Sequence, residues 1–366
     1  MRVAIDATAL LLRSAGVKSY TYYWLESLWR EAGPRDAVLT FPVPGPFGRL
    51  DHERSMAGFL RTAAGLAVLH GLNLSRLPWA LPGLDVFHVS THCHNPPRGA
   101  KLTTTVHDMT CWLMPELHSP ANVAVTQSHG GAMTRRADGV VAVSECSRRD
   151  AIDILDLDPN RVVVIYPGVP EPFFAVTAAD VHAARAKFGL EKPYVLSVGT
   201  VEPRKNLPAL IEAFAALSAT TREQYELVVA GPIGWADPAT VARVRGAGAG
   251  VRYLGYVDET DLPGLTAGAT LLAYPSLYEG FGLPVAQAMA AGTAVLTSDV
   301  SSLPEVAGEA AVLVDPRSTA EIRGGLERLL GSPALRERLG GAGRVRARQF
   351  HWNIAARRSL EWWRAL

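Results

Sequence analysis

The chain has 366 residues, 48% of them apolar, and at roughly 150 residues per domain this length predicts two globular domains with sizeable cores. Its 36 Lys and Arg residues nearly balance its 35 Asp and Glu residues, so it lacks the positive charge typical of nucleic-acid-binding proteins. Three cysteines, Cys93, Cys111 and Cys146, are too few for a disulfide framework, which favours buried thiols in a reducing cytoplasm.

Short runs rich in Val, Ile and Leu recur along the chain without alternating polar residues. Strands that are apolar on both faces and separated by helix-length segments predict an α/β fold with parallel sheets covered on two sides. The predicted strands are Val3–Ile5, Val86–Val89, Leu102–Val106, Val140–Val143, Val162–Ile165, Tyr194–Val198, Leu227–Val229, Leu271–Tyr274, Ala294–Leu296 and Ala311–Val314.

A seam between two domains is predicted at residues 166–172, where three prolines and one glycine prevent a helix or a central strand. The first domain then spans residues 1–168 and the second residues 169–350. The tail, residues 351–366, is amphipathic and rich in tryptophan, so we expect it to dock on a domain as a helix.

Two adjacent cations follow the predicted strand Tyr194–Val198 and the turn at Gly199. Arg204 and Lys205 stand directly before a helix with apolar residues at helical spacing from Leu207 to Ala215. A guanidinium and an ammonium at a helix N-terminus form an anion site, each charged hydrogen bond contributing about 1.5–3 kcal/mol. A diphosphate fits this description, and a solvated loop pair is the alternative.

A second strand end, after Leu271–Tyr274, carries an acid and two glycines. Gly280 and Gly282 allow close approach of a ligand to the backbone, and the free N–H groups of a helix start near residue 285 favour oxygen-rich groups. Glu279 can accept hydrogen bonds from hydroxyls. The combination predicts a site for a phosphorylated sugar, with a surface acid at a helix start as the alternative.

At this point the sequence strongly resembles the retaining GT-B glycosyltransferases of family 4, which include bacterial mannosyltransferases. The resemblance covers nearly the whole chain and is carried by "TTTVHDMTCWLMPE", "VVAVSECSRRDA", "VVVIYPGV", "GTVEPRKNLPALIEAFAAL", "ELVVAGPIGW", "VRYLGYV", "PSLYEGFGLPVAQAMAAGTAV" and "SSLPEVAGEAAVLVDP". It implies two Rossmann-like domains facing a central cleft. The second would bind the nucleotide-sugar donor, the first the acceptor, and helix 351–366 would cross back to the first.

The resemblance also implies roles for individual residues. Arg204 and Lys205 match the basic pair on the donor diphosphate, and Glu279 matches the residue that orients the donor sugar. The matching donor-binding positions also include Gly199 and the loop formed by Gly280, Phe281, Gly282 and Leu283.

Further matches lie elsewhere in the chain. His107 corresponds to a histidine beside the donor sugar. Gly16 corresponds to the glycine-rich first turn near the phosphates, although only one glycine remains here. Tyr256 and Val257 lie where the family binds the nucleotide base.

One position departs from the family pattern of two glutamates separated by seven residues. Eight positions after Glu279 the chain has Gln287, an amide where relatives use a carboxylate on the ribose hydroxyls. An amide has one acceptor oxygen where a carboxylate has two. Two hypotheses follow: a 2'-deoxyribose donor such as a dTDP sugar, or an ordinary ribonucleotide donor bound by Gln287.

For the reaction, cations fixed beside the leaving diphosphate stabilise its growing charge, which makes Arg204 and Lys205 catalytic candidates. The resemblance implies retention at the anomeric carbon, with no dedicated general base, cofactor or metal. The expected donor is a GDP-, UDP- or dTDP-sugar, most closely GDP-mannose, and the expected acceptor is a hydroxyl of a glycan, lipid-linked or small molecule.

Three other groups of residues invite different interpretations. His88, His92, Cys93 and His94 are crowded enough to suggest zinc, although hydroxyl-binding imidazoles on the acceptor side are the preferred interpretation. Asp156 and Asp158 have the spacing of acids that hold a divalent ion in another glycosyltransferase fold, and here they precede Pro159 in a polar turn. An aromatic cluster at residues 20–29 could contact a membrane, although Trp24, Leu25 and Leu28 at helical spacing more often indicate core.

The acid at Asp6 interrupts the first apolar run, so we expect no signal peptide and a cytoplasmic location, with peripheral contact at the inner membrane face left open. Two rivals remain. One is a catalytically weakened nucleotide-sugar-binding partner subunit, and the other is a nicotinamide-dependent oxidoreductase, which would need a glycine fingerprint that is missing after the first strand.

Overall fold

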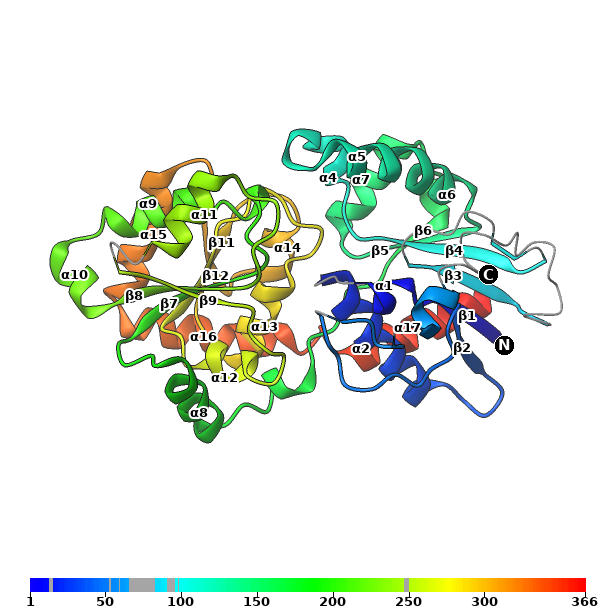
Figure 1. The fold of residues 1–366 in the computed structure, drawn as a ribbon, viewed down its shortest axis with the longest axis horizontal. Helices are drawn as coiled ribbons and strands as arrows, with labels where there is room; N and C mark the ends of the chain where they lie inside the picture. Colours follow the sequence, from blue (N-terminus) through cyan, green and yellow to red (C-terminus); the bar gives the residue numbers. More distant parts are fainter. Residues whose placement is uncertain are drawn as a thin grey trace. The chain divides into compact units, whose positions relative to one another are not determined.

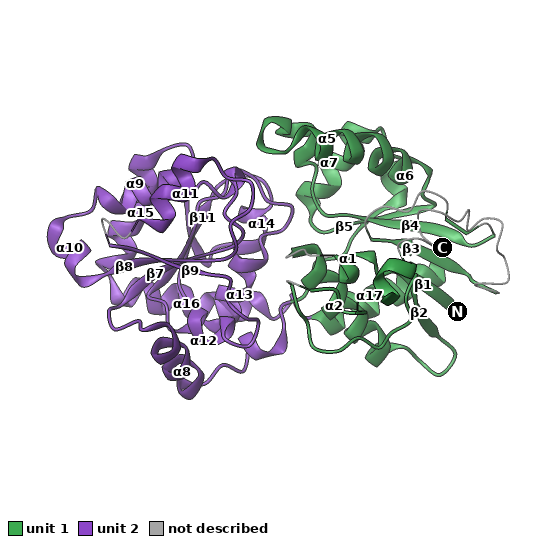
Figure 2. Ribbon diagram, viewed as in Figure 1, with its two compact units in different colours: residues 1–168, 352–366 green, residues 169–351 purple. Residues whose placement is uncertain are grey.

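The computed structural model divides the chain into two compact units, coloured separately in Figure 2. Unit 1 is Met1–Gly168 with Trp352–Leu366, and unit 2 is Val169–His351. The described residues are 1–12, 16–52, 54–58, 60–65, 83–90, 96–97, 99–246 and 250–366.

Unit 1 is built on a parallel sheet that has six strands in its described part, in the order β2-β1-β3-β4-β5-β6. The strands are β1 (Arg2–Asp6), β2 (Ala37–Phe41), β3 (Val86–Val89), β4 (Lys101–Val106), β5 (Gly139–Ala142) and β6 (Val162–Val164). The helices are α1 (Thr8–Leu11), α2 (Gly16–Glu31), α4 (Thr110–Leu113), α5 (Pro120–Val125), α6 (Gly131–Arg136), α7 (Glu145–Leu155) and α17 (Trp352–Ala365), with short turns η2 (Pro115–Leu117), η3 (Thr126–Gly130) and η4 (Pro159–Arg161). Figure 1 shows α2 and α17 on one face of this sheet and α5, α6 and α7 on the other.

The C-terminal helix α17 completes the core of unit 1 by packing on α2. The indole nitrogen of Trp24 in α2 donates a hydrogen bond to Ser359 Oγ at 3.1 Å, and that of Trp363 donates to Thr103 Oγ1 at 3.3 Å. Trp24, Leu25 and Leu28 are buried, which confirms that this stripe of α2 faces the core.

Unit 2 also has a six-stranded parallel sheet in its described part, in the order β12-β11-β10-β7-β8-β9. Its strands are β7 (Tyr194–Val198), β8 (Glu226–Ala230), β9 (Val251–Gly255), β10 (Leu271–Tyr274), β11 (Val295–Ser298) and β12 (Ala311–Val314). Its helices are α8 (Ala178–Phe188), α9 (Leu207–Ala215), α10 (Ala219–Gln224), α11 (Pro238–Arg245), α12 (Leu262–Ala267), α13 (Leu283–Ala291), α14 (Leu303–Ala307), α15 (Thr319–Leu330) and α16 (Pro333–Ala347), with turns η5 (Glu171–Phe173) and η6 (Pro203–Lys205).

Helices cover both faces of the unit 2 sheet. Figure 1 shows α9, α11 and α15 on one face, and α8, α12, α13 and α16 on the other. The α9 face closes over a buried apolar cluster that includes Leu210 and Phe214 of α9, Val195 of β7 and Leu326 of α15. Because both faces of the strands are buried, the strands read as continuous apolar runs in the sequence.

Parallel α/β sheets were predicted, and the structure confirms them. Two strands were not predicted. β2 and β9 each form one outer edge of a sheet, where most of their residues are only partly buried.

The two crossings of the chain between the units run side by side. Val169 N–H donates to Phe350 O at 2.7 Å, and Val169 forms an isolated parallel bridge with His351. A Cβ atom at Gly168 would lie 2.2 Å from the backbone nitrogen of Trp352, so the close approach of the crossings requires glycine there.

Candidate functional site

The strand order of unit 2 defines where its loops separate. From β7 the chain moves outward to β8 and β9, and from β10 it moves the other way to β11 and β12, although β7 and β10 are neighbours. At such a reversal of strand order the loops after the two strands diverge, and in open α/β sheets ligands bind in the crevice expected between them, outside the carboxyl ends of the strands. All of the charged residues described next belong to these two loops.

The turn after β7 is tied firmly to its neighbours. Arg204 and Lys205 end the short η6 helix, and Asn206 follows in the left-handed conformation with φ 57°. The Asn206 side-chain amide donates to Pro275 O at 3.1 Å and to Pro316 O at 2.6 Å. Leu277 N–H donates to Arg204 O at 2.9 Å. These bonds connect the cation-bearing turn to the loops after β10 and β12.

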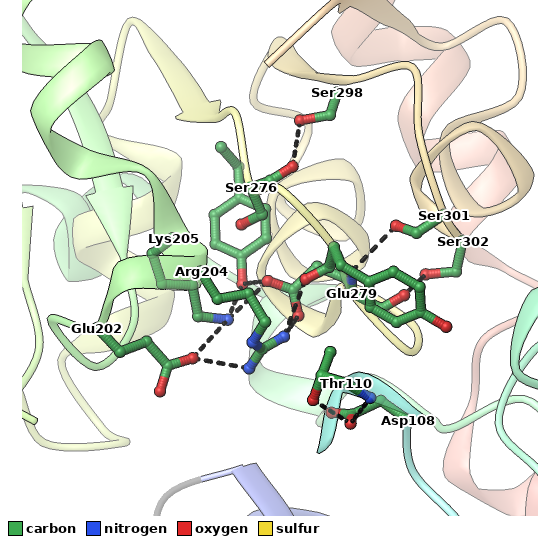
Figure 3. A network of polar contacts seen from close by, with 12 residues as sticks. Asp108, Thr110, Glu202, Arg204, Lys205, Ser276, Glu279, Ser298, Ser301 and Ser302 are labelled. Carbon is green, nitrogen blue, oxygen red and sulfur yellow. Dashed lines mark hydrogen bonds and ion pairs between the residues drawn. The ribbon is translucent and has the colours of Figure 1, made fainter. Parts of the chain in front are cut away.

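The side chains of Arg204, Lys205 and Glu279 form one hydrogen-bonded network, shown in Figure 3. Arg204 Nη1 donates to Glu279 Oε2 at 2.7 Å, and Lys205 Nζ donates to Glu279 Oε1 at 2.7 Å. The alternatives of a solvated cation pair and a surface acid are wrong, because Arg204 and Lys205 side chains are 15% and 13% exposed and Glu279 is 6% exposed.

Two residues that were not predicted complete this network. Arg204 Nη2 donates to Glu202 Oε1 at 2.7 Å. Lys205 Nζ donates to Tyr274 Oη at 2.6 Å, and Tyr274 Oη donates to Glu279 Oε1 at 2.8 Å. Tyr274 is the last residue of the apolar strand β10, so the sequence pattern predicts a core residue there. Glu202 stands two positions before Arg204 in a turn, which was the only sequence signal for it.

Burial and the network shift the pKa values of Glu279, Lys205 and Tyr274. Burial alone would raise the pKa of Glu279, but the charges of Arg204 and Lys205 and hydrogen bonds from Lys205 and Tyr274 lower it to about 2. Burial and the neighbouring Arg204 lower the pKa of Lys205, while Glu279 and Glu202 partly offset this. Burial and the Glu279 charge raise the pKa of Tyr274 well above its usual value, so its hydroxyl stays a neutral donor.

The loop after β11 holds the backbone of Glu279 on both sides. Glu279 N–H donates to Ser301 Oγ at 3.0 Å, and Ser302 Oγ donates to Glu279 O at 2.9 Å. Gly282, with φ 94°, directly precedes α13 as its N-cap residue, and a Cβ there would lie 2.6 Å from Leu303 Cδ2. Glycine at this position is thus required by backbone conformation and packing.

The remaining predicted donor-binding residues of unit 2 lie around the same edge of the sheet. Gly199 (φ 143°) follows β7 beside Lys205, and a Cβ at Gly231 after β8 would lie 2.0 Å from Gly199 O. Tyr256 and Val257 follow β9. The buried Gly280 and Phe281 precede α13, Leu283 is its first residue, and Gln287 stands partly exposed one turn further along the helix.

Two predicted residues, His107 and Gly16, belong to unit 1. His107 follows β4, and its ring packs edge-on against Tyr20 with centroids 4.8 Å apart. Burial lowers the pKa of His107 to about 4, so the imidazole is neutral at pH 7. Its Nε2 atom is buried and has no hydrogen-bond partner among the described residues. Gly16 is the first residue of α2, and no described atom lies within 4 Å of its would-be Cβ.

The residues that suggested a metal have other roles where the structure describes them. His88 is fully buried, its two ring nitrogens pair with Thr103 Oγ1 and Thr105 Oγ1 at 2.9 Å each, and Trp24 and Trp363 pack against it. It therefore belongs to the core and cannot offer its nitrogens to an acceptor. His92, Cys93 and His94 lie outside the described residues.

The other acids and thiols also have ordinary environments. Asp156 and Asp158 are exposed; Asp156 ends α7 and Asp158 caps η4, which confirms a polar turn. Cys111 and Cys146 are buried free thiols. Within the described ranges, no group of three metal-ligating side chains is found, and no helix has both the length and the apolar character needed to cross a membrane.

The fold matches solved GT-B glycosyltransferases over the full chain. The crystal structure of Anabaena Alr3699/HepE in complex with UDP and glucose superposes with a TM-score of 0.74 at 18% identity, covering 100% of both chains. WaaG, a glycosyltransferase involved in lipopolysaccharide biosynthesis, superposes with a TM-score of 0.71 at 17% identity, covering 98% of both chains. The architecture is therefore GT-B, two Rossmann-like units in one chain.

Sequence comparisons identify the family within this class. Residues 15–171 match the Glycosyltransferase Family 4 model, and residues 180–346 match Glycosyl transferases group 1. O-antigen chain mannosyltransferase B of Escherichia coli is 32% identical over 320 residues, which cover 86% of this chain and 84% of that protein. Serotype-specific mannosyltransferase WbdA of Escherichia coli is 29% identical over 284 residues, 76% of this chain but 35% of that longer protein.

The chain therefore belongs to glycosyltransferase family 4, and it is an enzyme that transfers a sugar from a nucleotide sugar. The rival assignment to nicotinamide-dependent oxidoreductases is wrong.

Proposed function

We propose that the chain transfers a mannosyl residue from GDP-mannose to a hydroxyl of a glycan or lipid-linked acceptor, with retention at the anomeric carbon. The donor sugar is suggested by two relatives that are named mannosyltransferases. The observation that carries the assignment of the site is the buried network of Arg204, Lys205 and Glu279 at the crevice of unit 2. The proposal includes a cytoplasmic location with peripheral membrane contact.

In this proposal the donor diphosphate replaces Glu279 as the partner of the two cations. Arg204 and Lys205 are held in place by Glu202, Tyr274 and backbone groups, so they need little reorganisation to receive phosphate oxygens. The Glu279 carboxylate, released from the cations, accepts hydrogen bonds from hydroxyls of the sugar. The loop Gly280–Leu283, Gly199, Tyr256 and Val257 contact the rest of the donor, with Gly16 near the phosphates.

The chemical step breaks the bond between sugar C1 and the diphosphate oxygen and forms a bond between C1 and the acceptor oxygen. The acceptor attacks from the face that the diphosphate leaves, and its proton passes to a phosphate oxygen. Arg204 and Lys205 stabilise the charge that grows on the leaving diphosphate. In this proposal neutral His107 lies beside the sugar, and its Nε2 atom, which lacks a described partner, accepts a hydrogen bond from a sugar hydroxyl while the other ring nitrogen bonds the Ser90 backbone.

The donor assignment is tested by incubating the enzyme with GDP-mannose, UDP-glucose and a dTDP sugar and measuring release of the nucleoside diphosphate. We expect GDP release from GDP-mannose above the other two donors. If only another donor releases its nucleoside diphosphate, the sugar of that donor takes the place of mannose in the proposal. If no donor releases its nucleoside diphosphate, the proposal is contradicted.

The base and the ribose are tested separately by calorimetry with GDP, UDP and dTDP. Gln287 stands where relatives carry the ribose-binding glutamate. A clear preference for a ribonucleotide removes the hypothesis of a deoxyribose donor, whereas tightest binding of dTDP supports it.

The alternative is a partner subunit that binds nucleotide sugar but is catalytically weakened by Gln287. Gln287 lies on α13, and a single substitution at this position tests the alternative. In a weakened subunit, Gln287→Glu should create transfer activity, whereas in a competent enzyme it should change turnover little.

A further inference from the structure

Glu202 approaches the cations from a different side than Glu279 (Figure 3). Its Oε1 atom lies 2.7 Å from Arg204 Nη2 and 3.9 Å from Lys205 Nζ, whereas Glu279 accepts from Arg204 Nη1. The side chain of Glu202 is 4% exposed. Two buried carboxylates thus share the two cations.

The local backbone gives no reason for this carboxylate. Glu202 precedes the η6 turn, but its side chain makes no capping hydrogen bond; the turn is closed by Lys205 N–H donating to Glu202 O at 3.1 Å. A buried acid beside a diphosphate site also repels the ligand, and burying a carboxylate is unfavourable unless it is paired. Its location therefore requires a benefit to the cations.

The benefit to the two cations follows from the charges that surround them before and after the donor binds. Without donor, Arg204 and Lys205 are balanced by Glu202 and Glu279. The donor diphosphate takes the place of Glu279, whose carboxylate turns to the sugar, but Glu202 is not displaced because it pairs with the other guanidinium nitrogen. A fixed partner on Nη2 leaves Nη1 directed at the ligand.

We propose that Glu202 is a positioning residue that holds the Arg204 guanidinium in its ligand-facing orientation and keeps Lys205 charged throughout the reaction cycle. The inference rests on the proposed function of the site. It assigns to Glu202 no contact with donor or acceptor.

The charge of Lys205 provides a readout that a structural role would not affect. The charged groups around Lys205 are Arg204 and Glu202 from its own turn and Glu279 from the loop after β10, and Tyr274 is the titratable hydroxyl. Burial and Arg204 lower the pKa of Lys205, while Glu279 and Glu202 oppose this. Removing the Glu202 charge must lower the pKa of Lys205 further, so the variant should lose its cation at lower pH.

The experiment compares wild type with Glu202→Gln, using hydrolysis of GDP-mannose and binding of inorganic pyrophosphate across neutral to alkaline pH. We expect kcat to fall about tenfold at pH 7 while affinity for pyrophosphate stays equal or rises, because the network gains net positive charge. The alkaline loss of pyrophosphate affinity should move to lower pH. Only the difference from wild type is interpreted, since pyrophosphate titrates in the same range.

Glu226→Gln is the matched control. Glu226 is a buried acid of the same unit that pairs with Arg252 at 3.0 Å, at the amino end of β8, where it begins the strand. The Glu226→Gln variant should lose about as much thermal stability as Glu202→Gln, but its pyrophosphate affinity should fall at the same alkaline pH as in wild type. The inference would be overturned if pyrophosphate affinity fell at the same alkaline pH in wild type and Glu202→Gln. It would also be overturned if Glu202→Gln and Glu226→Gln lost affinity and turnover in parallel. If wild type turns over no donor, the proposed function fails, while the pyrophosphate titration still decides the role of Glu202.

Discussion

Unit 1 and unit 2 share one plan but differ in what they place at the centre of the sheet edge. In unit 1 the loops separate between β1 and β3, and in unit 2 between β7 and β10. After β1, Asp6 accepts hydrogen bonds from the Thr8 backbone and hydroxyl, so its acid serves its own turn. After β7 and β10, four charged side chains bind one another. Strand topology sets where a crevice lies, and the loop residues decide what it can bind.

The largest expected effect tests whether the charged edge of unit 2 carries the chemistry. Lys205→Ala should lose about 3 kcal/mol of transition-state stabilisation, roughly a hundredfold in turnover. The measurement is nucleotide release from the donor that wild type uses. The control is Lys187→Ala on α8, which removes an ion pair with Asp261, the residue before α12. A loss of turnover below threefold would contradict the prediction that the charged residues of unit 2 carry the chemistry.

The second prediction concerns acid stability, where the two units should respond in different pH ranges. Burial lowers the pKa of His88 to about 3, so the native state binds fewer protons than the unfolded chain between about pH 6.5 and 3. Stability of unit 1 should therefore fall on acidification through that range, by at most about 5 kcal/mol. Glu279, with its pKa lowered to about 2, stabilises unit 2 above about pH 4.5 and loses this only below it.

Urea unfolding at several pH values, followed by tryptophan fluorescence, measures this difference, since Trp24 and Trp363 flank His88. His88→Gln should weaken the pH dependence of unit 1, and the buried His107, whose pKa is lowered to about 4, should account for part of the remainder. An unchanged slope in that variant would mean that other groups cause the acid response.

The third prediction separates catalysis from packing within unit 2. Tyr274→Phe removes a hydroxyl that bridges Lys205 and Glu279, so we expect about tenfold slower turnover and about 1 kcal/mol lower stability. Tyr194→Phe is the matched control, because its hydroxyl donates to Leu265 O at 2.6 Å away from the network. Equal effects of both substitutions on turnover would show that the Tyr274 hydroxyl has only a structural role.

The smallest effect is expected from Gln287→Glu. In a competent enzyme this substitution should change kcat/KM less than about threefold, roughly 0.6 kcal/mol, with a modest gain in ribonucleotide affinity. Calorimetry with GDP and a donor turnover assay measure the two parts. A large gain in turnover would instead identify a chain weakened at this position.

Most of the sheet framework could be predicted from the sequence, because central parallel strands are apolar on both faces. β2 and β9, two partly exposed edge strands, were missed: β9 interrupts its apolar residues with Arg252 and ends in Gly255, whereas β2, with the sequence AVLTF, is as apolar as strands that were predicted. In the site, Arg204, Lys205 and Glu279 were found by their positions after strands. The pairing of both cations with Glu279, and the participation of Tyr274, depend on contacts between segments about 70 residues apart, which local patterns do not encode. Glu202 bonds Arg204 only two residues away, but the turn sequence does not show that its side chain is buried against the cation.

His88 illustrates the opposite error of a suggestive local pattern. Its neighbours in sequence, His92, Cys93 and His94, made a ligand-binding role plausible, whereas Thr103 and Thr105 on the adjacent strand satisfy both ring nitrogens. Only the pairing of β3 with β4 reveals this.

The packing of α17 against α2 has a consequence for the order in which the protein matures on the ribosome. Most of unit 1 is made before unit 2, but the core of unit 1 includes Trp363 and Ser359, which are made after all of unit 2. Domains usually fold in the order in which they emerge. Here all described strands of unit 2 are made before unit 1 receives α17, so the nascent first part of unit 1 must wait, with the α2 surface uncovered, until α17 has been synthesised.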